Sequence, residues 1–317
     1  MTMGRPQPQD VSTVTCLGAG PIGAGWAAFF LATGHDVTSW ILEAKEEEKL
    51  RSLVETAWSA LEQLGTADGA SPGRWHVTTD LAAAVAGADF VQESVPEVLE
   101  VKQAVYADLG RLAPPDVVLC SSTSGLSMSD IQALCPSPER TVTGHPFNPP
   151  YLMPLVEIVA GRSTAPDVVA WTAAFFRHVG KAPLVMEREV PGFIATRLQE
   201  AIWREALHMI AAGEATVEQI DTAVTNGPGP RWALMGPCMV FHVGGGEGGM
   251  AYCLEQFGPA LKFPWSRLDA PELTDDLARR LIDGCDAAAP GEDFRTLSAK
   301  MNEGLVGILK ARRAAGL

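Results

Sequence analysis

Short apolar runs alternate with longer amphipathic segments along roughly the first 190 residues of the chain. Runs of β-branched and apolar residues are typical of buried parallel strands, and they lie at 12–17, 36–41, 75–78, 88–95, 117–121, 142–143, 155–159 and 182–186. Segments with apolar residues at helical spacing separate these runs, at 24–33, 43–63, 98–112 and 166–178. Such alternation predicts an α/β fold with a doubly wound, mostly parallel sheet.

The pattern changes near residue 190, beyond which only helical or loop-like segments follow. Pro191 is predicted to begin an amphipathic helix that reaches about Ala212, because proline is favoured in the first turn of a helix. Further helical segments lie at 216–224, 247–261, 274–283 and 294–311. We therefore predict a flexible N-terminal tail at 1–10, an α/β domain at 11–189 and an all-α domain at 190–317.

Composition and charge narrow the class of protein. The formal net charge of −14 argues against binding to nucleic acid or to anionic membrane surfaces, since both need clusters of lysine and arginine. The six cysteines show no CxxC pair and no zinc-ligand spacing, so we predict reduced thiols and no metal site. No apolar run has the roughly 20 residues of a membrane span, and the polar residues 1–10 do not resemble a signal peptide. These features predict a cytoplasmic protein.

A glycine-rich turn directly follows the first predicted strand. It comprises Gly18, Gly20 and Gly23 with Pro21 and Ile22 between them, and a helix and a second strand follow within about 30 residues. In a dinucleotide-binding turn, the first glycine makes the bend, the second lets backbone approach a pyrophosphate and the third allows close packing of helix on strand. The helix N-terminus then offers free N–H groups to the phosphates. We therefore predict a Rossmann-type nucleotide site at these five residues.

One histidine and one carboxylate flank a proline-rich segment between two predicted strands. His145 follows the strand that ends at Thr143, and Glu157 lies in the next strand. A carboxylate hydrogen-bonded to an imidazole fixes its tautomer and raises its basicity, which suits a general base near neutral pH. Ser124 also lies just past a strand end, at the edge where such sheets bind ligands. The set predicts hydride transfer from an alcohol to a nicotinamide; the alternative is a structural histidine in a proline-rich loop.

Together these motifs resemble the 3-hydroxyacyl-CoA dehydrogenase superfamily over nearly the whole chain. Besides the glycine turn, the resemblance rests on ESVPE at 93–97, SSTS at 121–124, HPFNP at 145–149, PLVE at 154–157 and PGFI at 191–194. It implies that Ser124, His145 and Glu157 are the catalytic set. It also implies that Glu97 and Lys102 contribute to the NAD site and that the helical domain makes a homodimer.

Segments of the second half are similar to the branch of this family whose members oxidise L-carnitine to 3-dehydrocarnitine with NAD. They are GPGPRWALMGP at 227–237, GGGEGGM at 244–250 and EQFGPA at 255–260. The resemblance implies a small substrate with a quaternary ammonium group, which binds against aromatic faces. The substrate-binding candidates are Phe147, Asn148, Thr196, Arg197, Trp232 and Phe241, with Arg231 and Trp265 as further possibilities. Core packing is the alternative for the aromatic residues, and structural salt bridges for the arginines.

Two positions depart from the family pattern. The family has an acid at the end of the second strand, where it binds the adenosine ribose, and Ile41 stands there instead. Glu43 lies two residues on and, if the strand alternation continues, on the same side, so it is a candidate replacement. No arginine replaces the missing acid, so a dedicated NADP site is not indicated. We predict NAD as the cofactor, with weakened binding or relaxed specificity. Thr196 replaces a family asparagine, which disfavours an acyl-CoA substrate.

Three functions remain open from the sequence. The first is a carnitine-type 3-hydroxyacid dehydrogenase. The second is a dehydrogenase of another small 3-hydroxy acid, such as gulonate, or of a 3-hydroxyacyl-CoA. The third is a non-catalytic, crystallin-like nucleotide-binding protein, against which the intact Ser124, His145 and Glu157 argue.

Overall fold

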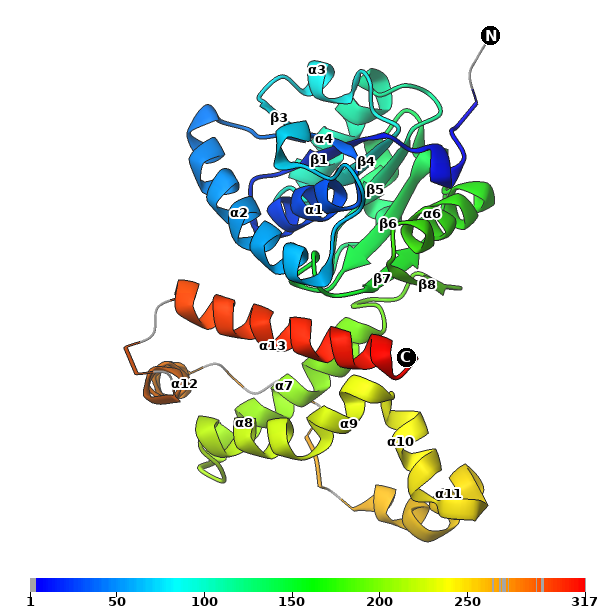
Figure 1. Ribbon diagram of the computed structural model, residues 1–317. Coiled ribbons are helices and arrows are strands. Elements are labelled where there is room, and N and C mark those ends of the chain that lie inside the picture. Colours follow the sequence, from blue (N-terminus) through cyan, green and yellow to red (C-terminus); the bar gives the residue numbers. More distant parts are fainter. Residues whose placement is uncertain are drawn as a thin grey trace. The chain divides into compact units, whose positions relative to one another are not determined.

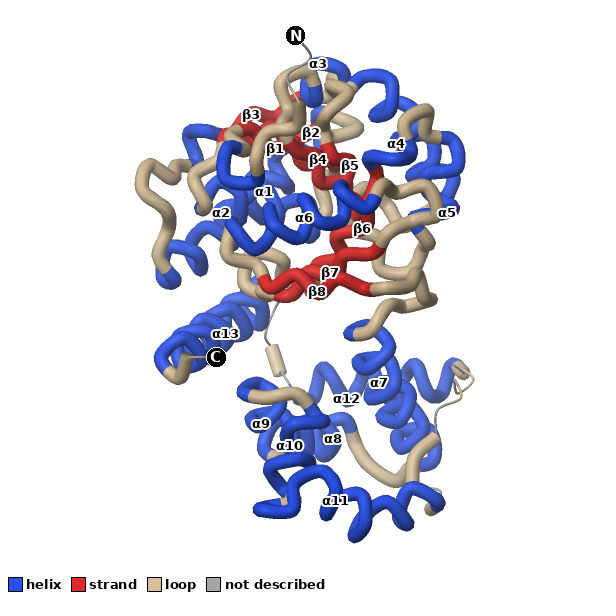
Figure 2. The backbone as a smooth tube through the Cα atoms, turned by 90° about the vertical axis from the view of Figure 1, so that its right-hand side faces the viewer, coloured by secondary structure: helices blue, strands red, loops and turns tan. Residues whose placement is uncertain are grey.

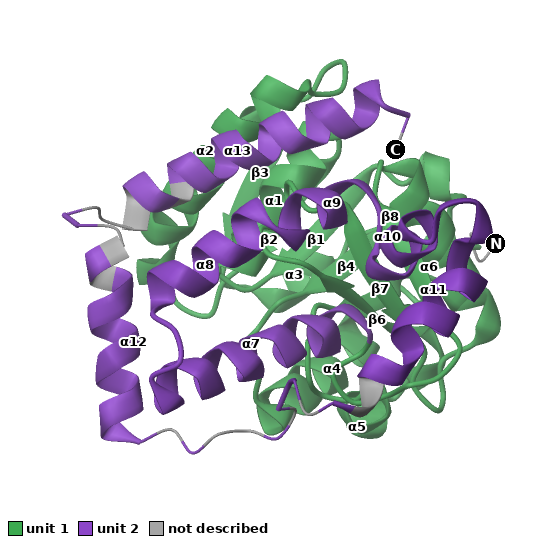
Figure 3. Cartoon of the chain, turned by 90° about the horizontal axis from the view of Figure 1, so that it is seen from below, with its two compact units in different colours: residues 1–193 green, residues 194–317 purple. Residues whose placement is uncertain are grey.

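The chain forms two compact units, residues 1–193 and residues 194–317 (Figure 3). The computed structural model describes residues 4–263, 265–267, 269, 272, 274–288, 290–291 and 294–316 of the 317. The first unit combines a sheet with helices, and the described part of the second contains helices and no strand. The predicted fold class is therefore confirmed.

An eight-stranded sheet organises the first unit (Figure 2). Its strands lie in the spatial order β3-β2-β1-β4-β5-β6-β7-β8. Their bounds are β1 Thr13–Leu17, β2 Asp36–Trp40, β3 Trp75–Thr78, β4 Phe90–Glu93, β5 Val118–Ser121, β6 Thr141–Pro146, β7 Leu155–Val159 and β8 Ala182–Met186. All neighbours pair in parallel except β6 and β7, which are antiparallel. A short connection suffices for an antiparallel pair, whereas each parallel pair needs a crossover.

Helices cover both faces of this sheet (Figure 1). Alternate strand residues point to opposite faces, so the central strands β1, β4 and β5 contribute to two hydrophobic clusters. One cluster contains the aromatic side chains Trp26, Phe30, Phe90 and Phe175, which are fully buried. It is covered by α1 Pro21–Ala32, α2 Glu47–Leu64 and α6 Pro166–His178. The other is covered by α3 Leu81–Val85, α4 Leu99–Leu112 and α5 Met128–Ile131.

Short 3₁₀ turns complete the connections. They are η1 Pro8–Asp10, η2 Ala44–Glu46, η3 Pro72–Arg74, η4 Gln132–Leu134 and η5 Pro138–Arg140. Two residues of the predicted N-terminal tail are bonded to α6. Arg5 pairs with Asp167 at 3.1 Å, and the indole N–H of Trp171 donates to the carbonyl of Pro6 at 2.7 Å. Residues 1–3 of the predicted tail lie outside the described residues.

The second unit is built from helices of very different length. They are α7 Ala195–Ala212, α8 Val217–Asn226, α9 Pro228–Leu234, α10 Pro237–Gly244, η6 Gly246–Gly248, α11 Gly249–Phe257, η7 Gly258–Lys262, α12 Asp275–Ala288 and α13 Phe294–Ala314. The first begins four residues later than predicted, because Gly192 and Phe193 adopt φ values of 68° and 50° that no α-helix contains. The motif at 227–237 folds into α9 and the start of α10, which the sequence pattern did not predict. Within the described residues no helix is long and apolar enough to cross a membrane.

Candidate active site

His145 and Glu157 face each other across the antiparallel pair β6–β7. The strand register places the two residues directly opposite, so their side chains share one face of the sheet. His145 Nδ1 lies 2.9 Å from Glu157 Oε2, and both side chains are almost completely buried. A carboxylate on Nδ1 favours the tautomer that carries its proton there, which leaves Nε2 with a free lone pair. The geometry is that of an oriented general base.

Two aromatic rings pack around this imidazole. Phe147 meets His145 edge to face with centroids 5.7 Å apart, and Phe193 lies 5.4 Å from it at a tilt of 47°. Phe193 is buried and has positive φ, so the turn before α7 delivers this ring to the histidine. The sequence argument did not single out Phe193; its place directly after Pro191-Gly192 is the signal that points to it. The two rings limit how far the imidazole can rotate.

A buried lysine is hydrogen-bonded to the connection between β6 and β7. Lys181 Nζ donates to the carbonyl of Pro150 and, at 3.0 Å, to that of Met153. Its ammonium also lies 3.8 Å from the ring centroid of Phe29 and 5.1 Å from that of Trp26, both on α1. Burial lowers the pKa of Lys181 to about 7. Sequence reasoning missed this residue, because a lone lysine at a strand start reads as an exposed charge.

The glycine turn has the shape that a dinucleotide needs. Gly18 has φ 107°, and a side chain there would collide with the backbone of Ser94 on the neighbouring β4 segment. A side chain at Gly23 would collide with the Gly18 carbonyl. At Gly20 an added Cβ would meet no atom within 4 Å, so this residue borders open space at the N-terminus of α1. That space, next to the unpaired N–H groups of the first helical turn at Ile22 and Gly23, fits a pyrophosphate.

The loop after β5 is organised by the carboxylate of Glu97. Its Oε1 accepts a hydrogen bond from the hydroxyl of Thr123 at 2.6 Å. The same oxygen accepts from the backbone N–H groups of Ser124 and Gly125 at 2.9 and 3.0 Å. Burial alone would raise the pKa of Glu97, but these hydrogen bonds and the nearby charge of Lys102 outweigh it and hold the pKa below its usual range. Glu97 is therefore ionised, and its carboxylate positions the backbone of Ser124.

Lys102 lies beneath the surface rather than at it. Its side chain is 1% exposed, and Nζ pairs with Glu93 at 2.7 Å and with Glu97 at 3.3 Å. Ser121 donates to the second oxygen of Glu93 at 2.6 Å, so that carboxylate is engaged on both sides. The contribution of Lys102 to an NAD site stays a prediction. Lys102 neutralises two carboxylates and steadies the one that holds Ser124.

Ser124 follows β5, and His145 lies near the end of the neighbouring parallel strand β6, which continues to Pro146 rather than ending at Thr143 as predicted. The register pairs Ser121 with Thr143, and the two functional residues come three and two positions later. Ser124 is exposed, so its hydroxyl is accessible at the carboxyl edge of the sheet. The turn that begins at Gly18 follows β1 at the same edge, since β1, β4, β5 and β6 run parallel. One rim of the first unit thus carries the glycine turn, the hydroxyl and the imidazole.

The ribose position differs from what strand alternation suggests. β2 ends at Trp40, and Ile41 is 1% exposed and packs in the core below α1 and α2. Glu43 is exposed, caps η2 together with Glu46 and pairs with Lys45. The strand alternation therefore does not continue from residue 41 to residue 43. The role of Glu43 at the ribose stays a prediction.

The remaining substrate candidates lie in two separate groups. Phe147 and Asn148 belong to the β6–β7 connection of the first unit, where Asn148 is exposed and its bond to Pro149 is cis. Thr196 and Arg197 lie in the first turn of α7. Trp232, Phe241 and Trp265 are 39%, 58% and 75% exposed, and Arg231 is also exposed. Core packing, the alternative for these three aromatic residues, is thus not what the second unit shows.

Comparison with known proteins identifies the class that this fold and rim define. The profile described as 3-hydroxyacyl-CoA dehydrogenase, NAD binding domain, matches residues 13–190, and the C-terminal domain of the same enzymes matches residues 192–280. The chain belongs to the 3-hydroxyacyl-CoA dehydrogenase family, a family of NAD-dependent dehydrogenases.

Particular relatives cover almost the whole chain. It is 53% identical to an L-carnitine dehydrogenase of Streptomyces coelicolor over 98% of this chain and 97% of that one. It is 47% identical to an L-carnitine dehydrogenase of Bacillus cereus, over 95% and 92% of the two chains. Among solved structures, an NAD⁺-dependent dismutase, 5-formyl-3-hydroxy-2-methylpyridine 4-carboxylic acid 5-dehydrogenase, superposes with a TM-score of 0.80 at 28% identity. That match covers 96% of this chain and 99% of the other.

Proposed function

We propose that this protein is an NAD-dependent dehydrogenase that oxidises the 3-hydroxyl group of L-carnitine to give 3-dehydrocarnitine. The observation that carries the proposal is the buried His145–Glu157 pair, 2.9 Å apart, on the rim that also bears the glycine turn. Similarity to L-carnitine dehydrogenases over nearly the full length supports the choice of substrate.

The proton transfer in this proposal belongs to His145. Its Nε2 accepts the hydroxyl proton of the substrate, while the Glu157 carboxylate stabilises the imidazolium that forms and keeps the ring oriented. The exposed hydroxyl of Ser124 donates to the substrate oxygen and holds it near the imidazole. The glycine turn and the first turn of α1 would hold the pyrophosphate of NAD, whose nicotinamide supplies the hydride acceptor.

In this proposal, aromatic residues bind the quaternary ammonium group of the substrate, and an arginine binds its carboxylate. A quaternary ammonium group cannot donate hydrogen bonds, so aromatic faces are its best partners. We assign this role to Trp232 and Phe241, whose exposed rings lie on the consecutive helices α9 and α10, and to Phe147 beside the imidazole. Arg197, exposed in the first turn of α7, is our candidate for the carboxylate, and Asn148 and Thr196 for further polar contacts.

A substrate panel at alkaline pH tests the proposal. NADH absorbance is followed with L-carnitine, D-carnitine, gulonate, 3-hydroxybutyrate and 3-hydroxybutyryl-CoA, for the native protein beside His145→Ala. We expect the highest kcat/KM with L-carnitine and a loss of about 10²–10⁴-fold in the variant. Preference for another substrate would reject the carnitine assignment, and full activity of His145→Ala would reject the mechanism.

We further propose that NAD is bound with weakened or relaxed specificity. Ile41 offers no oxygen to the adenosine ribose, and Glu43 is occupied at the start of η2. Michaelis constants for NAD and NADP are the test, with Glu43→Ala as the companion variant. A low KM for NAD with no use of NADP, unchanged in Glu43→Ala, would contradict this proposal.

Two further proposals concern the oligomeric state of the protein and its location in the cell. We propose a homodimer formed through the helical unit, because Met239, Leu254 and Phe257 there leave more than half of their surface exposed. We also propose a cytoplasmic location. In support, none of the six cysteines forms a disulfide, and Cys16, Cys120, Cys135 and Cys253 are buried.

A further inference from the structure

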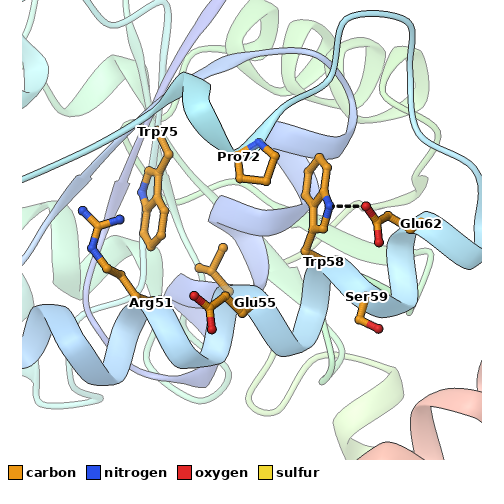
Figure 4. A pocket seen from close by; sticks show the side chains of 8 residues that line it. Arg51, Glu55, Trp58, Ser59, Glu62, Pro72 and Trp75 are labelled. Atoms are coloured by element: carbon orange, nitrogen blue, oxygen red, sulfur yellow. Dashed lines mark hydrogen bonds between the residues drawn. The ribbon is translucent and has the colours of Figure 1, made fainter.

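The first unit has a slot between the rings of Trp58 and Trp75, away from the rim that carries the glycine turn and His145. The cavity has a volume of about 310 Å³ and lies between α2 on one side and η3 with the start of β3 on the other. Trp58 and Trp75 stand on either side of it, with Pro72 and Glu55 between them (Figure 4). Trp75 is the first residue of β3 and pairs with Val37, near the start of β2. The slot therefore lies toward the amino ends of these strands, whereas the glycine turn follows a carboxyl end.

Both indole rings are fixed in place by their polar edges. Trp75 Nε1 donates to the hydroxyl of Ser39 at 2.9 Å, and Trp58 Nε1 donates to Glu62 at 2.7 Å. Each ring is only half-buried, so apolar aromatic surface remains open toward the cavity. Rigid rings with anchored edges make preorganised walls, which reduces the entropy that a ligand loses on binding.

The charge around the slot favours a cation. Arg51 lies over Trp75 with its guanidinium 5.0 Å from the ring centroid, on the side away from Trp58 (Figure 4). That charge is already matched by Glu47, which accepts two hydrogen bonds from Arg51. Glu55 makes no hydrogen bond or ion pair within the described part of the chain, and Glu62 is bonded only to an uncharged indole there. Two uncompensated carboxylates thus flank two π-faces.

We propose that this slot is a second, non-catalytic binding site for a small organic cation with a quaternary ammonium head. Such a head is too weakly hydrated to prefer water, and it cannot donate hydrogen bonds, so indole faces satisfy it better than carboxylates alone. The carboxylates of Glu55 and Glu62 supply the counter-charge without direct contact. The face of Trp75 toward Arg51 shows the same attraction, since a guanidinium already occupies it.

Choline and its uncharged carbon isostere 3,3-dimethyl-1-butanol are the probes that test this site. The indole ¹H–¹⁵N signals of the full-length protein are titrated with each probe at constant ionic strength, without NAD. Trp58→Leu and Trp75→Leu assign the two signals. We expect saturable shifts of both signals with choline, and an affinity for choline about three- to thirtyfold higher than for the alcohol.

Matched variants separate the slot from general electrostatics and from the dehydrogenase site. Glu55→Gln is expected to weaken choline binding about threefold or more, while Glu48→Gln, two turns away on the same helix, leaves it unchanged. Neither variant should alter kcat for L-carnitine. Equal affinity for the two probes, absence of saturable shifts at Trp58 and Trp75, or equal effects of the two glutamine variants would overturn the proposal.

Discussion

At the scale of single residues, the proposed mechanism separates groups that do chemistry from groups that orient them. His145 presents one nitrogen to Glu157 and leaves the other for a substrate, while Phe147 and Phe193 limit the rotation of its ring. Lys181 instead binds two carbonyls of the connection between β6 and β7. We expect substitution of the Glu157 carboxylate to change kcat, and substitution of Lys181 to change how stability depends on pH.

Replacing Glu157 by glutamine should lower kcat by about 10²–10³-fold, because the imidazolium loses its counter-charge while the side-chain volume is kept. The KM for NAD should not change. The measurement is steady-state kinetics on Glu157→Gln, on His145→Ala and on the double variant. Since the two residues act as a unit, the double variant should be no slower than His145→Ala alone. Multiplicative losses would mean that the two act independently.

Lys181 should make stability depend on pH. Burial lowers its pKa to about 7, against about 10.4 for an exposed lysine, so between these values the unfolded chain binds more protons than the folded one. Stability from this group therefore rises with pH across that window, by at most about 1.4 kcal/mol per pH unit. Below pH 7 the full cost of burying the ammonium is present.

Denaturant unfolding at pH 7, 8, 9 and 10 measures this effect. The difference in unfolding free energy between the native protein and Lys181→Met should shift in favour of the native protein as pH rises. Lys49→Met, at an exposed position of α2, is the control and should show no such trend. A difference between native protein and Lys181→Met that stays constant across this range would refute the assigned pKa.

At the scale of elements, the loop after β5 depends on a residue that lies between β4 and α4, earlier in the chain. Glu97 precedes α4 and accepts three hydrogen bonds from the Thr123–Gly125 segment. The buried Lys102 on α4 keeps that carboxylate ionised. The segment from Glu97 to α4 therefore supplies both the carboxylate that binds the loop and the lysine that pairs with this carboxylate.

Glu97→Gln should loosen this loop and lower kcat. An amide oxygen accepts more weakly than a carboxylate, and hydrogen bonds to charged groups contribute about 1.5–3 kcal/mol. Hydrogen exchange of the Ser124 and Gly125 amides should therefore quicken about tenfold or more. Glu100→Gln, an exposed carboxylate one turn away on α4, is the matched control. Unchanged exchange in Glu97→Gln would show that the loop is held by other contacts.

At the scale of the whole molecule, the two units differ in how they treat apolar side chains. The first unit buries large aromatic residues such as Phe30, Phe90 and Tyr106 in two clusters, one on each face of the sheet. The second leaves many large apolar side chains exposed, among them Leu254 and Phe257 of α11. A monomeric soluble protein rarely keeps such surface open, which is why a second copy is the expected cover.

Sedimentation velocity should find the mass of two chains for the native protein. Leu254→Glu combined with Phe257→Glu should shift it to one chain, because charges buried in an apolar interface are not compensated. Leu134→Glu, which alters an exposed leucine of the first unit, should leave the mass unchanged. A native monomer would contradict the proposed homodimer.

Much of the first unit was predictable because its determinants are local. The strand runs, the glycine turn and the proline-set segment after His145 each follow from neighbouring residues, and the sheet edge then places Ser124 and His145 on one rim. The second unit was predicted less well: α9 and α10 are short, rich in glycine and proline, and lack the periodicity that announces a helix.

The sequence by itself determined the fold class, the family and the catalytic candidates, since each depends on residue type and spacing along the chain. Only the tertiary structure decided which charges are buried and what they touch. It placed Lys181 against the connection between β6 and β7, paired Lys102 with Glu97 and buried Ile41 in the core. Burial and partnership arise from segments distant in sequence, so no local pattern encodes them.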